Sequence, residues 1–287
     1  MMKTMGKHSI KKPEWLKVKV PGGPHYRDLK SILNEHNLHT VCSEARCPNM
    51  EECWARRSAT IMILGDTCTR SCRFCAVKTG RSGIVDDGEP LRVAEAIKKM
   101  QLKHVVLTSV DRDDLPDGGA AVWTETVKEI HEMLPAVTIE ILIPDFNGNE
   151  KDLNTVFSSL PNVLSHNLET AEHLYKTIRP QADYYQSLNV LKSAYKAGLR
   201  TKSGIMLGLG EDAEDIIKIM KDARAHHCDI FTIGQYLQPT PMHIPVQRYV
   251  HPDEFNFYKD EGLKMGFRFV ESAPLVRSSY HADAHVN

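Results

Sequence analysis

The chain has 287 residues, of which 41% are hydrophobic and 25% charged, an ordinary composition for a globular protein. Its net charge of −1 and pI near 6.9 argue against a nucleic-acid partner, because binding to phosphates needs a strongly basic surface. No apolar run approaches the ~20 residues that cross a bilayer, and no secretion signal opens the sequence. We therefore expect a cytoplasmic protein with no membrane and no nucleic-acid partner.

Residues 1–58 show no regular alternation of strands and helices, and we expect them to form an N-terminal extension. From Ala59 to residue 237, short apolar runs alternate with amphipathic helical segments. The expected strands are 59–64, 104–110, 137–143, 163–168, 201–207 and 230–237, and the helices between them include 91–100, 120–133, 184–198 and 212–226. Residues 238–287 are expected to form a C-terminal extension with a helix at 252–265, a short strand at 267–271 and a polar tail.

Apolar strands separated by helices indicate buried parallel strands and an α/β fold. Six such units predict an open partial (β/α)6 TIM-like barrel with N- and C-terminal extensions. A doubly wound sheet is the alternative, but its glycine-rich turn after the first strand is missing. In parallel barrels the reactive groups gather at the carboxyl ends of the strands. The residues that follow or end the strands here include several cysteines and polar groups: Cys68, Cys72, Cys75, Ser109, Asp111, Asn167, Glu169 and Gln235.

Six of the seven cysteines lie between positions 42 and 75, in two groups of three. Disulfides are not expected in the reducing cytosol, so this clustering calls for a metal. Cys68, Cys72 and Cys75 have the spacing C-x3-C-x2-C, which suits a four-iron cluster with one iron left open for a small molecule. Structural zinc would need a second cysteine pair, and the cysteine run of an electron-carrying ferredoxin is absent.

The segment CTRSCRFC resembles the signature of the radical S-adenosylmethionine (SAM) superfamily, with Phe74 as its aromatic residue. The resemblance implies that SAM binds the open iron and that an electron from the cluster cleaves it to a 5′-deoxyadenosyl radical. Such a radical is needed to attack an unactivated C–H bond, which no side-chain base can deprotonate.

The second group, Cys42, Cys47 and Cys53, has the spacing C-x4-C-x5-C. These could be inert buried thiols, but three within 12 residues favour a second cluster that is also one protein ligand short. With this motif the chain closely resembles the lipoyl synthase family, through segments that cover almost the whole sequence: TVCSEARCPNMEECW, ATIMILGDTCTRSCRFCAVKTG, HVVLTSVDRDDLPDGGA, IEILIPDF, SHNLET, RPQADYYQSLNVL, TKSGIMLGLGE, TIGQYLQPT and PLVRSSYHA.

This resemblance implies insertion of two sulfur atoms, at C6 and C8 of a protein-bound octanoyl-lysine, with the second cluster as the sulfur source. It implies two [4Fe–4S] clusters and SAM as cofactors. Octanoylated lipoyl-carrier domains, an external electron donor and iron–sulfur assembly proteins for cluster repair would be the partners. The fourth ligand of the second cluster would be a serine of the RSSY motif, Ser279 or alternatively Ser278. The SAM contacts would map to Asn167, Glu169, Arg179 and Gln235.

Cys228 lies outside both groups, and we expect it to be a buried small hydrophobic residue. Two other functions stay open at this point. A methylthiotransferase acting on transfer RNA would also use two clusters, but it should bring an RNA-binding domain and a basic surface. A non-enzymatic metal-binding module is disfavoured by the polar groups at the strand ends.

Overall fold

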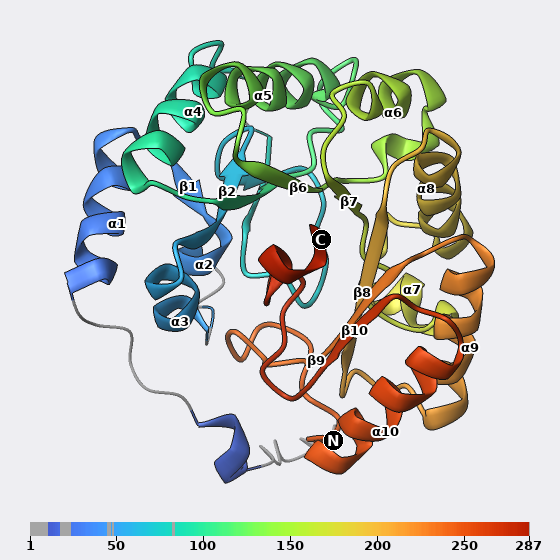
Figure 1. Ribbon diagram of the computed structural model, residues 1–287. Coiled ribbons are helices and arrows are strands. Elements are labelled where there is room, and N and C mark those ends of the chain that lie inside the picture. Colours follow the sequence, from blue (N-terminus) through green and yellow to red (C-terminus); the bar gives the residue numbers. More distant parts are fainter. Residues whose placement is uncertain (1–10, 18–23, 45–46, 48, 82–83, 287) are drawn as a thin grey trace, which may run out of the picture.

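The computed structural model describes residues 11–17, 24–44, 47, 49–81 and 84–286. Its main feature is a curved eight-stranded sheet with the strand order β1-β2-β5-β6-β7-β8-β9-β10, whose two edges do not join (Figure 1). Within the described ranges, no helix is both long enough and apolar enough to cross a membrane.

Six parallel strands form the centre of this sheet: β2 (Ser58–Ile63), β5 (His104–Ser109), β6 (Thr138–Leu142), β7 (Val163–Ser165), β8 (Thr201–Leu207) and β9 (Ile230–Gln235). They match the six predicted strands, and the expectation of an open partial barrel is confirmed. Two further strands extend the edges. β1 (His39–Thr40) pairs antiparallel with β2, and β10 (Phe269–Ser272) pairs parallel with β9.

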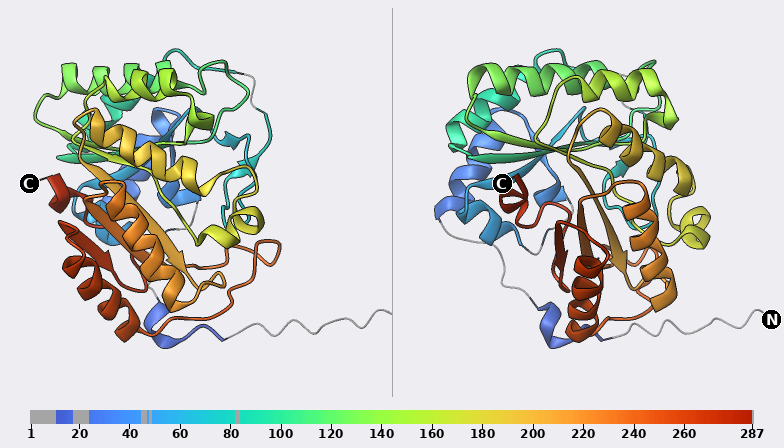
Figure 2. Two further views of the ribbon diagram at one scale, coloured as in Figure 1. Left: turned by 90° about the vertical axis from the view of Figure 1, so that its right-hand side faces the viewer. Right: turned by 45° about the vertical axis from the view of Figure 1, so that its right-hand side comes forward.

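Helices cover the outer face of the sheet: α4 (Glu89–Met100), α5 (Ala120–Met133), α6 (Glu150–Phe157), α8 (Tyr184–Lys196), α9 (Ala213–Ala225) and α10 (Pro252–Lys264) (Figures 1 and 2). The short helix α7 (Tyr175–Ile178) lies instead among the loops at the carboxyl end of the strands, where the Arg73 amide donates to the Ile178 carbonyl. Their termini follow from local sequence. Asp212 caps α9 and forms a reciprocal capping box with Asp215. Ile216, Ile219 and Met220 then form the buried face of that helix at helical spacing.

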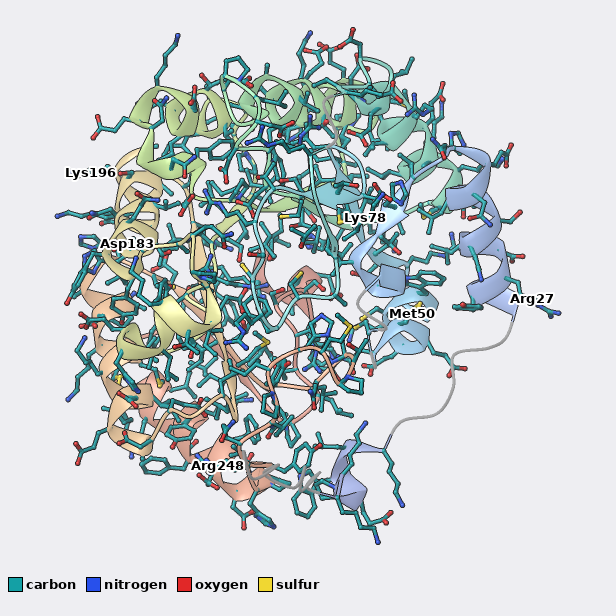
Figure 3. The ribbon with its side chains drawn as sticks, turned by 180° about the vertical axis from the view of Figure 1, so that it is seen from behind. Arg27, Met50, Lys78, Asp183, Lys196 and Arg248 are labelled. Carbon is teal, nitrogen blue, oxygen red and sulfur yellow. The ribbon has the colours of Figure 1, made fainter. Side chains whose placement is uncertain are left out.

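The strand residues pack on both faces of the sheet. Every residue of β2 and of β9 is buried, which explains why these strands are near-continuous apolar runs in the sequence. In register across the sheet, Ile61 pairs with Leu107, and Leu107 pairs with Ile141. Seen from behind, side chains fill the space that the sheet and helices enclose (Figure 3).

The two extensions meet at one side of the barrel. The N-terminal extension contributes η1 (Glu14–Leu16), α1 (Pro24–Glu35), α2 (Val41–Glu44) and α3 (Met50–Ala55). Residues 273–286, here called the tail, follow β10 and end in the 3-10 helix η4 (Ala282–Val286). The tail begins at the carboxyl end of the strands, where residues 276–278 lie, and in the side view of Figure 2 its last helix, η4, lies at the opposite end of the barrel. The tail passes so close to β9 that a Cβ at Gly234 would be 2.1 Å from the Val276 carbonyl oxygen.

Candidate functional site

The loop that follows β2 carries the C-x3-C-x2-C motif to the carboxyl end of the barrel. It leaves the strand through Leu64 and Gly65, which both have positive φ (65° and 85°). A short two-stranded sheet, β3 (Thr67–Cys68) and β4 (Lys78–Thr79), closes the loop on itself. The Cys75 amide donates to the Cys72 carbonyl at 3.0 Å. The three cysteines are therefore held on one compact turn.

Arg70, inside this loop, is buried and fixes the loop to neighbouring strand ends. Its guanidinium donates to Asp113 at 2.8 and 3.0 Å, to Asp145 at 2.7 Å and to Asn147 at 2.9 Å. Asp111 lies 3.3 Å from the same group. Burial alone would raise the pKa of Asp145, but the hydrogen bond and charge of Arg70 outweigh it and lower the pKa to about 2. The cysteine loop is thus anchored by a buried ionic network.

A cavity of about 360 Å³ opens at this end of the barrel, a size typical of small-molecule sites. All residues predicted for the SAM side of the site line it: Cys68, Cys72, Phe74, Cys75, Asn167, Glu169, Arg179 and Gln235. Much of the remaining wall is apolar and includes Met62, Val110, Leu142, Ile143, Ile205 and Met206.

Four polar atoms of this cavity's lining residues are buried without a hydrogen-bond partner: Oγ of Ser109, Nε2 of His166, Oδ1 of Asn167 and Nε of Arg179. Buried polar atoms are nearly always paired in folded proteins. Four exceptions around one cavity indicate a polar ligand that supplies the missing partners.

Glu169 and Arg179 are two of the charged residues that line the cavity. Glu169 has a positive φ of 68°, a strained conformation for a residue with a side chain, and its carboxylate accepts from Asn167 Nδ2 at 3.0 Å. Burial raises the pKa of Glu169, and the Arg179 guanidinium opposes that rise. Arg179 donates to the Asn167 carbonyl at 3.0 Å and to the Tyr175 hydroxyl at 3.1 Å.

Gln235 lines the cavity differently, because its amide is already paired with the backbone. Its Nε2 donates to the carbonyls of Leu207 at 2.9 Å and Arg248 at 3.1 Å, and its Oε1 accepts from the Val250 amide at 2.8 Å. Its side chain therefore shapes the cavity by holding the segment that follows β9.

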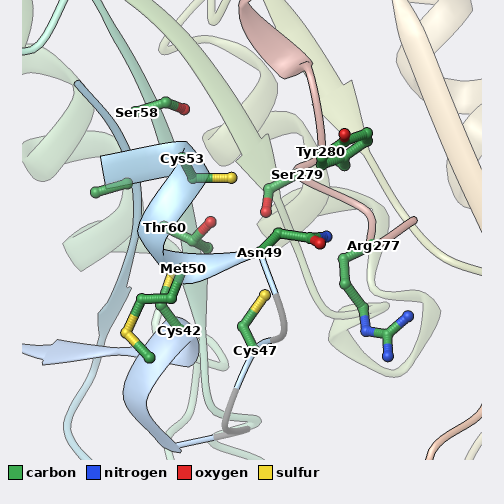
Figure 4. Close-up of a pocket in the computed structure, with 11 residues that line it drawn as sticks. Cys42, Cys47, Asn49, Met50, Cys53, Ser58, Thr60, Arg277, Ser279 and Tyr280 are labelled. Carbon is green, nitrogen blue, oxygen red and sulfur yellow. The ribbon is translucent and has the colours of Figure 1, made fainter. Parts of the chain in front are cut away.

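A second, much smaller cavity of about 10 Å³ lies at the amino-terminal end of β2. It is lined by Cys42, Cys47, Cys53 and Ser279, together with Ser58–Thr60 of β2, Asn49, Arg277 and Tyr280. Figure 4 shows Cys53 and Ser279 turned toward one another across this cavity. The Asn49 side chain donates to the Leu275 carbonyl at 2.7 Å and so connects the cysteine segment with the tail.

The donor set of each triplet suits an iron–sulfur cluster better than a single ion. Burial, and secondarily the charge of a neighbouring thiolate, raise the pKa of Cys47 to about 11 and of Cys53 to about 12. Burial likewise raises the pKa of Cys68 to about 12 and of Cys75 to about 11. Such thiols become thiolates only beside a strong positive charge, which bound iron supplies.

Among the described residues, no three histidine, cysteine, aspartate or glutamate side chains converge closely enough to hold one metal ion. A four-iron cluster does not require such convergence, because each cysteine binds a different iron.

The two cavities adjoin at the tail. Arg277 lines both of them, Ser278 lines the large one and Ser279 lines the small one. Val41, which lines the large cavity, is next in sequence to Cys42, which lines the small one. The large cavity thus extends from the Cys68–Cys75 loop to the edge of the second triplet.

Sequence reasoning assigned no role to Asn49 or Arg277, although both lie inside the motifs that it used. Asn49 lies within CPNMEEC and Arg277 within RSSY, and these positions could have indicated that both residues lie near the second triplet. Cys228 is buried, as expected, and its thiol contacts the Ile230 carbonyl rather than either cavity.

Comparison with known proteins decides the family. The Radical SAM superfamily matches residues 62–223, and the N-terminal domain of lipoyl synthase matches residues 2–47. Lipoyl synthase of Christiangramia forsetii is 54% identical over 96% of this chain and 94% of its own length. The chain belongs to the lipoyl synthase family. The Chlorobaculum tepidum and Nematostella vectensis (mitochondrial) lipoyl synthases are 53% and 52% identical, each over 96% of this chain and 95% of the relative.

As a lipoyl synthase family member, the chain is a radical SAM enzyme that inserts sulfur, and it uses SAM and a [4Fe–4S] cluster. Solved structures support the fold alone. Methylornithine synthase aligns with a TM-score of 0.55 at 18% identity, covering 90% of this chain and 86% of its own. SuiB of Streptococcus suis bound to S-adenosylmethionine aligns with a TM-score of 0.60 at 12% identity, covering 87% and 55%.

Proposed function

We propose that the chain converts a carrier-bound octanoyl-lysine to lipoyl-lysine by inserting sulfur at C6 and C8. The sulfur would come from a [4Fe–4S] cluster held by Cys42, Cys47, Cys53 and Ser279. One observation carries this proposal: a single cavity runs from the Cys68–Cys75 loop to the tail residues that border the second triplet. An alkyl chain bound in that cavity would lie between the radical-forming cluster at one end and the sulfur-donating cluster at the other.

On the radical side, Cys68, Cys72 and Cys75 would hold the first cluster. When bound there, the reduced cluster and SAM supply a carbon radical that can abstract hydrogen from an unactivated C–H bond. We propose that Arg179 pairs with the carboxylate of SAM and that Asn167 and Glu169 accept hydrogen bonds from its polar groups.

The rest of the cavity would bind the other parts of the two ligands. Phe74 would pack on SAM, and Gln235 would act through the backbone that it holds. The apolar wall suits the octanoyl chain and excludes water from the radical.

On the donor side, the mixed ligand set has a chemical purpose. Clusters favour soft thiolates, and a serine oxygen is a harder ligand that iron releases more readily. This suits a cluster that is itself consumed. Ser279 is our choice for the ligand because it lines the small cavity, whereas Ser278 lines the large one.

The proposal implies three segments and three kinds of partner. Residues 59–237 form the radical SAM barrel, and the extensions 1–58 and 238–287 build the donor site against it. The partners would be octanoylated lipoyl-carrier domains, an external electron donor, and iron–sulfur assembly proteins that rebuild the spent cluster. We place the reaction in the cytoplasm.

An anaerobic assay with SAM, dithionite and an octanoylated carrier tests the proposal. We expect about eight irons per chain in the wild type. Cys72→Ala should abolish 5′-deoxyadenosine formation, whereas Cys47→Ala should still form it but make no lipoyl product. Cys228→Ser is the matched control and should keep both clusters. Lipoyl product from Cys47→Ala would refute the sulfur source, and product on transfer RNA instead of the carrier would refute the substrate.

A further inference from the structure

The tail that carries Ser279 ends in a buried polar cluster that lies outside both cavities. Lys202 of β8 and Glu140 of β6 are fully buried and form an ion pair of 2.9 Å inside the barrel. His285 of η4 is also fully buried, and its Nδ1 lies 3.4 Å from the Lys202 Nζ. We call these three residues the floor cluster. None of them lines the cavities described above.

A buried ion pair is a poor source of stability, because removing two charges from water costs about as much as their attraction returns. Buried ion pairs more often serve to fix the position of the segment that contacts them. The segment in contact here is the tail. His285 accepts from Lys202 through Nδ1, which leaves its Nε2–H directed toward Glu271 of β10, at 3.9 Å. Arg200 donates to the His285 carbonyl at 2.6 Å.

The tail is also held to the two ends of α3, the helix that carries Cys53. Asn49 bonds to the Leu275 carbonyl before Ser279, and Arg56 pairs with Asp283 at 2.7 Å after it. The Arg56–Asp283 pair is largely exposed to solvent and contributes little. The floor cluster is therefore the only fully buried polar attachment that we find downstream of Ser279 in the described part of the tail.

We propose that His285 is a positioning residue for the sulfur-donating site. Its contact with the Glu140–Lys202 pair fixes the end of the tail, and the tail in turn holds the Ser279 hydroxyl against the second triplet, Cys42, Cys47 and Cys53. This inference rests on the role proposed for Ser279. Because the chain is attached on both sides of Ser279, the hydroxyl is held near the iron at a high effective concentration. Loss of the attachment at His285 should therefore weaken the bond between Ser279 and iron, although the serine itself is unchanged.

The test isolates the donor site by replacing Cys68, Cys72 and Cys75 with alanine in the full chain, so that all iron belongs to the second triplet. The reconstituted protein should hold about four irons, and the rate of iron removal by a chelator is measured anaerobically. We expect His285→Ala to accelerate removal on the order of tenfold. His285→Gln, which can still accept from Lys202, should restore much of the wild-type rate. His131→Ala on α5 is the matched control and should change nothing.

A double-variant cycle separates positioning from a general loss of fold. In a Ser279→Ala background there is no hydroxyl to position, so His285→Ala should cause no further acceleration. Equal acceleration with and without Ser279, or none with Ser279 present, would overturn the inference while leaving the serine ligand in place. If Ser279→Ala itself had no effect, the serine assignment and this inference would both fall. Circular dichroism of each variant checks the fold.

Discussion

Arg70 offers the sharpest test of how the cysteine loop is held. In Arg70→Met the hydrophobic stem is kept and the charge removed. Three carboxylates then lose their common partner, and one of them, Asp145, is fully buried. Gln186 still donates to Asp145 at 2.8 Å, but no cation replaces the guanidinium within this network.

The size of the effect follows from the Asp145 carboxyl. Its pKa is lowered from 3.8 to about 2, and at about 1.36 kcal/mol per pH unit this corresponds to roughly 2 kcal/mol of folding free energy. Breaking a buried ion pair typically costs ~3–5 kcal/mol, because the remaining charge is left uncompensated. We therefore expect Arg70→Met to lower the free energy of unfolding by about 2–5 kcal/mol at pH 7.

The sign of the pH dependence is also fixed. Because the folded pKa of Asp145 is depressed, its contribution is present above the unfolded value near 4 and is lost as the pH falls toward about 2. In Arg70→Met, burial is unopposed and this carboxyl takes up a proton at a higher pH. The stability difference between wild type and variant should shrink as the pH falls through this range.

Urea unfolding of the iron-free chains measures these differences. Arg70→Met with Asp145→Asn should recover part of the loss, because the orphaned charge is gone. Arg92→Met is the matched control: Arg92 forms a partly exposed pair with Asp86 at 2.7 Å, and its loss should cost less than ~1 kcal/mol. A loss below ~1 kcal/mol for Arg70→Met, or no recovery in the double variant, would refute the reasoning.

Three further outcomes are expected. Ser279→Cys should keep both clusters and SAM cleavage but insert sulfur poorly, because a thiolate holds iron more tightly; equal lipoyl yield in an anaerobic single-turnover assay would contradict the role of the hydroxyl. Gly234→Ala places a Cβ 2.1 Å from the Val276 carbonyl oxygen, so it should displace the tail and destabilise the chain by about 1–3 kcal/mol. Its iron content after reconstitution should fall toward about four per chain, and unchanged iron would show that the tail tolerates the shift. Arg179→Lys keeps the charge but loses the planar fork, and equilibrium dialysis should show SAM binding about tenfold weaker; unchanged affinity would remove Arg179 from the SAM contacts.

The barrel could be predicted from the sequence because its strands are apolar runs with helices between them, and local patterns decide such elements. The positions at which the strands end were predicted less accurately. β7 was expected to reach residue 168 but ends at Ser165, after which the chain turns into the cavity and Glu169 takes a positive φ. A strained residue at a functional site is not visible in an apolar pattern.

The donor site could be predicted only in part. Cysteine spacing indicated a cluster, yet spacing alone could not place Arg277 in the wall between two cavities. It also could not show Asn49 holding the tail, since that contact joins residues 226 positions apart. The floor cluster was equally hidden, because Glu140, Lys202 and His285 come from three distant segments and form no motif.

That separation has a consequence for biosynthesis. At ~5–20 residues per second, a ribosome needs about 10–45 seconds to add the 226 residues between Asn49 and Leu275. During this time Cys42, Cys47 and Cys53 have emerged while the tail that lines their cavity does not yet exist. Three neighbouring thiols are then open to oxidants and to competing metals. Both cavities are lined by tail residues, so neither can close until synthesis is nearly complete, and the cysteines of the second triplet stay accessible until then.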